Sequence, residues 1–111
     1  MLATASIYFF STRGGYTSSC DSFYKLVEKQ DAQFAPMAEK LIRYEDEGNN
    51  RGLCIVGREE VIPAMKRWIQ ETHAHAKGQC GSRANRLRED LKSELSTMKK
   101  DVAHACDLAG L

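Results

Sequence analysis

Residues 82–109 read SRANRLREDLKSELSTMKKDVAHACDLA, and this stretch does more than any other to decide the fold. Apolar side chains recur in it at steps of three and four residues, which is the spacing of one face of an α-helix. Ser82 is a suitable N-cap for that helix. The stretch therefore predicts one long amphipathic helix, with its apolar stripe at Leu87, Leu91, Leu95, Met98 and Val102.

A helix over residues 82–109 is long for so small a chain. At 1.5 Å per residue it rises about 42 Å, whereas a small compact domain is about 30 Å across. Part of the helix is therefore expected to overhang or to find a partner. One interpretation is that it packs back on a preceding helix, Glu59–His75, as a helical hairpin. The other adds a dimer seam, because so regular a stripe can serve a second copy as well.

Composition and charge set the remaining limits. The 111 residues fit a single domain, 1–111, and sixteen basic against fifteen acidic side chains leave a net charge of +1. No general attraction to nucleic acid or to an anionic membrane follows from that balance. The first residues, MLATASIYFFSTRGG, lack the basic start and the unbroken apolar run of a signal peptide.

We therefore expect a cytoplasmic protein without a membrane span. The cysteines are spread singly along the chain rather than clustered, and without an export signal they are expected to be reduced thiols that serve as small core residues. They are Cys20, Cys54, Cys80 and Cys106.

Two stretches have the character of strands. Residues 3–11 are rich in β-branched and aromatic types and lead to the turn Arg13-Gly14-Gly15. Residues 53–56, Leu-Cys-Ile-Val, form an apolar run between two glycines, as a central strand does. Between them we expect a short helix from Phe23 and a second helix from Pro36 that ends at Gly48.

The order of these elements predicts an α+β fold, with a small two- or three-stranded sheet covered by helices. A small α/β fold with parallel strands is the alternative, since a strand, helix, helix, strand order also suits a parallel crossover. In the alternative, the loops after the two strands meet at the carboxyl edge of the sheet, where α/β proteins bind ligands. Hydroxyls, glycine amides and guanidinium groups there would suit an anion or a phosphate, and an enzyme acting on it: Ser11, Thr12, Arg13, Gly14, Gly15 and Arg58.

A glycine-punctuated turn before the last helix is a second candidate site. Basic and amide side chains gather where the recognition helix of a helix-turn-helix protein reads DNA. A nucleic-acid-binding regulator is therefore one alternative function, with these residues as its contacts: Lys77, Arg83, Asn85, Arg86 and Arg88.

Histidine and cysteine side chains near residue 75 supply the chemical types that bind zinc. His73 and His75 are two positions apart, however, and point about 200° from one another on a helix. His104 and Cys106 lie on a different element, so no metal or cofactor is expected. Cys20 at a helix start has no base placed beside it by spacing, and no catalytic residue is assigned.

The pattern as a whole favours a non-enzymatic protein that works by binding another protein. We expect a homodimer assembled through the Leu87–Val102 face, with Tyr16, Trp68 and Arg83 presented to the partner. Small regulators and inhibitors, including those carried by phages and other mobile elements, have this size and character.

Overall fold

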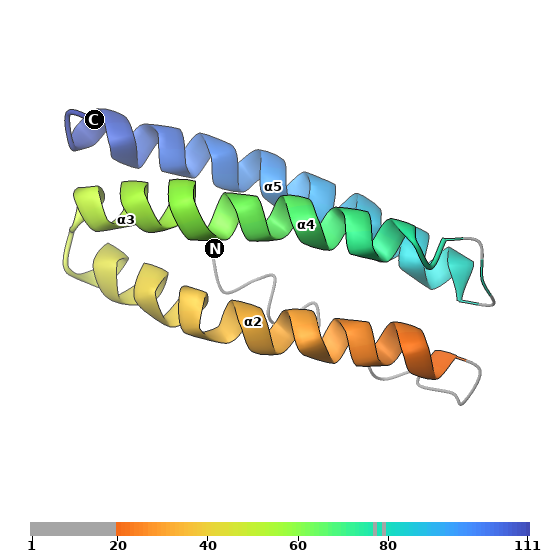
Figure 1. Ribbon diagram of the computed structural model, residues 1–111. Helices are drawn as coiled ribbons and strands as arrows, with labels where there is room; N and C mark the ends of the chain where they lie inside the picture. Colours follow the sequence, from red (N-terminus) through yellow and green to blue (C-terminus); the bar gives the residue numbers. More distant parts are fainter. Residues whose placement is uncertain (1–19, 77, 79) are drawn as a thin grey trace.

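The computed structural model describes residues 20–76, 78 and 80–111. Within these ranges the chain is helical and contains no strand. Three rods lie side by side, and the middle one is built of three segments that follow one another without a break (Figure 1). The elements are α2 (Asp21–Asp46), then α3 (Asn50–Val56), η3 (Gly57–Val61) and α4 (Ile62–His73) in the middle rod, and α5 (Gly81–Leu108).

The expected α+β fold is wrong for these residues, and so is the α/β alternative. The predicted strand at residues 53–56 lies in α3. Asn49 explains the helix start, because its side-chain Oδ1 accepts a hydrogen bond from the Gly52 amide at 2.9 Å. A four-residue apolar run does not separate a strand from a buried helix. The other predicted strand, residues 3–11, lies outside the described residues.

A single helix, α2, replaces the two helices expected between Phe23 and Gly48. Pro36 lies inside it, where a proline removes one backbone hydrogen bond. Pro36 and Ala32, whose carbonyl loses its partner, are both exposed residues of α2. Leu41 on this helix is buried, whereas the adjacent Ile42 is 44% exposed.

The middle rod contains a π turn. The Ile62 amide bonds to the Gly57 carbonyl, five residues back, where an α-helix would bond four back. Pro63 follows directly, and the wider turn relieves the clash that its ring would otherwise make with the Glu59 carbonyl. Gly57 is buried, and a Cβ atom there would collide with the side chain of Val102 on α5. The glycine therefore lets the two rods approach closely.

The molecule is elongated, measuring 48 × 20 × 17 Å. Its length accommodates the 28 residues of α5, which rise about 42 Å. The long helix was predicted correctly, and so was its hairpin with the preceding helix, since α4 packs along α5. The expected overhang is absent within the described chain, because the neighbouring rods are nearly as long.

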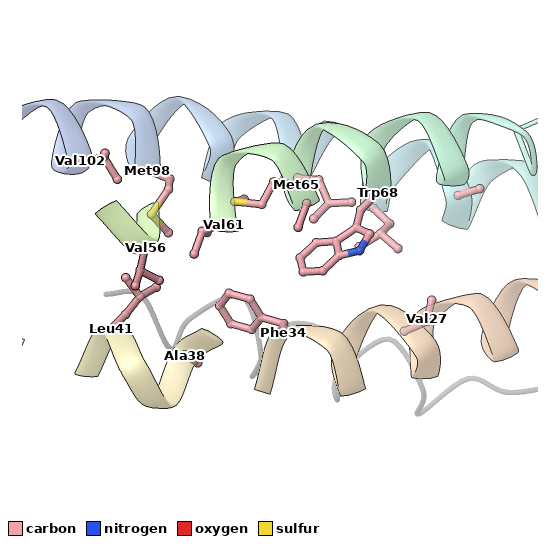
Figure 2. Packing of buried hydrophobic residues seen from close by; sticks show 14 of the residues in the cluster. Val27, Phe34, Ala38, Leu41, Val56, Val61, Met65, Trp68, Met98 and Val102 are labelled. Atoms are coloured by element: carbon pink, nitrogen blue, oxygen red, sulfur yellow. The ribbon is translucent and has the colours of Figure 1, made fainter. Parts of the chain in front are cut away.

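The core runs the length of the bundle between the rods (Figure 2). Trp68 lies in its middle, 1% exposed, and its indole N–H donates to Gln33 Oε1 at 2.8 Å. The ring of Phe34 stands edge-on to it at 6.1 Å. The sequence-based assignment of Trp68 to a partner surface is therefore wrong, because its aromatic area is already covered.

Two disulfides cross-link the rods. Cys20 pairs with Cys80, with Cα atoms 5.7 Å apart, and Cys54 pairs with Cys106 at 4.8 Å. Both separations are within the range of ordinary disulfides. The expectation of reduced thiols is thus corrected. The cysteines looked scattered because each pair joins positions 60 or 52 residues apart, and such pairings cannot be deduced from spacing.

Candidate functional site

One end of the bundle, which we call the acidic end, is formed by residues 41–55 and 98–111. There α2 passes into α3, and α5 finishes (Figure 1). Cys54–Cys106 ties α3 to α5 at this end. None of the helices in the described part of the chain has the length and apolar character needed to cross a bilayer.

Local sequence holds the acidic end in shape. Gly48 and Gly110 have positive φ angles of 66° and 75°, and each ends a helix in a Schellman motif. The Gly48 and Asn49 amides bond to the carbonyls of Glu45 and Tyr44. The Gly110 and Leu111 amides bond in the same way to those of Asp107 and Cys106. The helix ends here are therefore satisfied by backbone alone.

A hollow of about 180 Å³ opens at the acidic end between α2 and α5, with α3 contributing to its wall. A cavity of about 150 Å³ lined by apolar side chains holds a benzene molecule, so one branched or aromatic side chain fits this hollow. It is well below the 300 Å³ or more of a typical site for a drug-sized ligand. Its lining residues are Leu41, Leu53, Met98, Val102 and Ala105, with Glu45, Asn50, Asp101 and His104.

The carboxylates around this hollow are unpaired. Within residues 20–76, 78 and 80–111, neither Glu45 nor Asp101 has an ion-pair or side-chain hydrogen-bond partner. Further acidic residues stand at the last turns of α2 and α5, where the helix dipole already disfavours negative charge. They are Asp46, Glu47 and Asp107.

Exposed apolar side chains gather at the same end. Among the described residues, four large hydrophobic side chains are more than a third exposed, and all four lie on segments of the acidic end. Single exposed hydrophobics are ordinary, but their confinement to one end of a bundle is not. They are Ile42 at 44%, Ile55 at 38%, Leu108 at 60% and Leu111 at 48%.

The opposite end, around Cys20–Cys80, differs in its charges. A hollow of about 200 Å³ lies there beside the disulfide, lined by residues that include Phe23 and His75. Arg83 donates to the Tyr24 hydroxyl, and its guanidinium lies 5.8 Å from that ring. Arg88 contacts His73 and Glu89. Arg83 and Arg88 are therefore engaged within the chain.

This engagement bears on the predicted nucleic-acid contacts. Arg83 and Arg88 make the internal contacts just described, although Arg83 is exposed, as is Arg86. Asn85 is partly buried, and Lys77 lies outside the described residues. In the part that the structure describes, the predicted patch thus presents two exposed arginines, Arg83 and Arg86, of which Arg83 is also bonded to Tyr24.

The predicted assembly stripe lies inside the single chain. Leu87 is 0% exposed and Leu91 2%, and Met98 and Val102 are also buried, while Leu95 packs at the edge of the core. Figure 2 shows Met98 and Val102 turned toward the neighbouring rods. A second copy would reach Leu87 and Leu91 only by displacing the neighbouring rods, whereas Met98 and Val102 also line a hollow of the surface.

The remaining sequence candidates are not brought together. Arg58 is exposed on η3, and Ser11, Thr12, Arg13, Gly14, Gly15 and Tyr16 lie outside the described residues. The thiols of Cys20, Cys80 and Cys106 are consumed in disulfides. No group of three or more metal-binding side chains occurs in the described chain.

Comparison with protein-family models, curated proteins and solved structures finds no match for this chain. The candidate site is therefore defined by geometry and charge alone. Sequence reasoning missed it, because its residues are 60 or so positions apart and each is unremarkable where it stands. Consecutive acids at Glu45–Glu47, at a helix end that disfavours them, were the available signal.

Proposed function

We propose that this protein is a small non-enzymatic interaction module that binds another protein through the acidic end. One observation carries the proposal: all the large exposed apolar side chains of the described residues lie at the end of the bundle where the hollow opens, outside its lining. Interfaces are built in this way, from an apolar centre with a pocket for an anchoring side chain and a polar rim.

The partner surface is placed here, and not on the Leu87–Val102 stripe, because that stripe already packs within the chain. A second copy of the protein remains a candidate partner for the acidic end. Light scattering over a range of concentrations measures this directly. A mass that stays at one chain favours a different protein as partner, whereas a dimer that dissociates on dilution makes the homodimer the working form.

The binding test is a selection from a random peptide library displayed on phage, using the oxidised protein as bait. Enriched peptides are then measured against Ala105→Met, which fills the hollow, and against Ala103→Met, which adds the same side chain at an exposed site on the same helix. We expect Ala105→Met to weaken binding at least tenfold and Ala103→Met to leave it unchanged. No enriched peptide, or equal binding to both variants, would overturn the proposal.

We also propose that the protein works in an oxidising compartment, in place of the cytoplasm expected from its sequence. All four cysteines of the chain are paired, and structural disulfides persist where thiols are not kept reduced. Thiol alkylation of the protein taken from its native cells tests this. Modification only after reduction supports the proposal, whereas four reactive thiols before reduction would restore the cytoplasmic assignment.

A further inference from the structure

We infer that the partner of the acidic end is a basic segment of a protein that inserts one apolar side chain into the hollow, with lysine or arginine residues beside it. This inference rests on the proposed function and names the chemistry of the partner. Its basis is the combination, at one place, of an apolar hollow and unpaired carboxylates.

The size and lining of the hollow define the anchor. The apolar lining comes from all the rods that meet here: Leu41 from α2, Leu53 from α3 and Val102 from α5. About 180 Å³ admits one leucine, isoleucine, methionine or phenylalanine side chain and excludes a larger ligand. Burying such a side chain is worth about 1.5–3 kcal/mol, or roughly ten- to hundredfold in affinity.

The rim defines the charge of the flanking residues. Glu45 on α2 and Asp101 on α5 stand on two sides of the hollow without an internal cation. The carboxyl ends of α2 and α5 add the negative ends of two helix dipoles. The cations of this end are not paired with either carboxylate within the described residues: Arg43 is stacked over the Tyr44 ring at 5.2 Å, and Arg51, Lys99, Lys100 and His104 are exposed.

Stability alone does not account for these acids. Glu45, Asp46 and Glu47 are consecutive in the last turn and C-cap of α2, where neutral or basic residues would be more stable. Asp107 repeats the arrangement in the last turn of α5, which has no basic residue. Placements that work against local stability tend to mark functional sites. A cationic partner turns the same charges into an attraction.

Three synthetic peptides, acetylated and amidated, test the inference. The first carries one leucine flanked by lysines in an alanine-rich background, the second replaces the leucine with alanine, and the third replaces the lysines with glutamates. Affinity for the oxidised full-length protein is measured by fluorescence anisotropy at low and moderate salt. We expect the first peptide to bind about ten- to hundredfold more tightly than the second. The third is expected not to bind.

Charge-neutral variants locate the interaction. Glu45→Gln combined with Asp101→Asn should weaken the first peptide about tenfold at low salt and flatten the salt dependence. The matched control combines Glu28→Gln on α2 with Asp90→Asn on α5, at the opposite end of the same helices, and should bind like the parent. Melting temperatures confirm that both double variants are folded.

The possible failures are distinguishable. If library selection yields peptides that need the open hollow but carry neutral or acidic flanks, the cationic partner is refuted while the proposed function stands. If neither the library nor the lysine peptide gives binding that Ala105→Met abolishes, the proposed function fails as well. If excess unlabelled protein displaces the peptide and dimerises, the occupant is a second copy, and the inference of a basic partner is overturned.

Discussion

Each end of the bundle is closed by a disulfide, but the two ends differ in how their charged side chains are paired. Cys20–Cys80 closes one end and Cys54–Cys106 the other, and each end has a hollow of similar size. At the Cys20–Cys80 end, Arg83 and Arg88 are held by side chains of the same chain. At the acidic end the carboxylates are unpaired and apolar side chains are exposed. The contrast separates an end that stabilises the fold from one that suits binding.

Removal of the disulfides should have the largest effect on stability, and it tests the difference between the two ends most directly. Replacing either cysteine pair by alanine should cost about 4 kcal/mol in unfolding free energy, because loops of similar length are released. Only the Cys54→Ala, Cys106→Ala variant should also lose peptide binding, since that bridge ties α3 to α5 beside the hollow. Urea unfolding and anisotropy measure the two quantities. Equal loss of binding in both variants would contradict the division between the ends.

The close approach of the middle rod to α5 at Gly57 should give the next largest effect on stability. Gly57→Ala places a methyl group against Val102 and should cost about 1–3 kcal/mol through overpacking. Gly78→Ala is the control, because the nearest atom to its added Cβ is 3.8 Å away, an ordinary contact. Thermal unfolding measures both variants. A Gly57→Ala protein as stable as the parent would show that the rods have room to move apart.

Exposed apolar side chains at the acidic end provide a sharper test of the comparison. Leu108→Ser removes the most exposed of them, 60% accessible, and should change stability by less than about 0.5 kcal/mol. Binding of the peptides selected on this protein should fall several-fold. Ser82→Ala, at an exposed position near the start of α5, should leave binding unchanged. Undiminished binding by Leu108→Ser would remove this residue from the interface.

Neutralising the acids at the helix ends should have the smallest effect on stability, and the change should be an increase. Glu47→Gln and Asp107→Asn should each raise stability, by about 0.3–1 kcal/mol at low ionic strength, because each removes a negative charge from a negative dipole end. The same changes should weaken binding of the lysine peptide. Glu28→Gln, away from a carboxyl end of α2, should show neither effect. Lower stability in Glu47→Gln would indicate that the acid has a structural role.

Local signals predicted the helices better than the fold class. The stripe of α5, the stop at Gly48 and the hairpin with α4 were all readable, because periodicity and capping act over a few residues. Residues 53–56 were misread as a strand, since burial of a short run is the same in a strand and in a helix. Asn49, directly before α3, supplies the cap that decides between them.

The candidate site was not predictable in the same way. Leu41, Leu53 and Val102 line one hollow, but Leu53 was predicted to lie in a strand and Val102 in an assembly stripe, and no local signal joined them. Trp68 shows the reverse error, since a large aromatic side chain in an amphipathic segment gives no sign of which neighbour will cover it. Exposure depends on how the rods are placed, and placement is not a property of one segment.

By itself, the sequence determined where helices form and end, because hydrophobic spacing, the Asn49 cap and the glycines at 48 and 110 act through local backbone geometry. Only the tertiary structure decided which cysteines pair, whether the α5 stripe faces its own chain, and which charges remain unpaired. Those outcomes follow from the distances between residues 50 or more positions apart. Close packing of whole rods sets such distances, and no local preference encodes them.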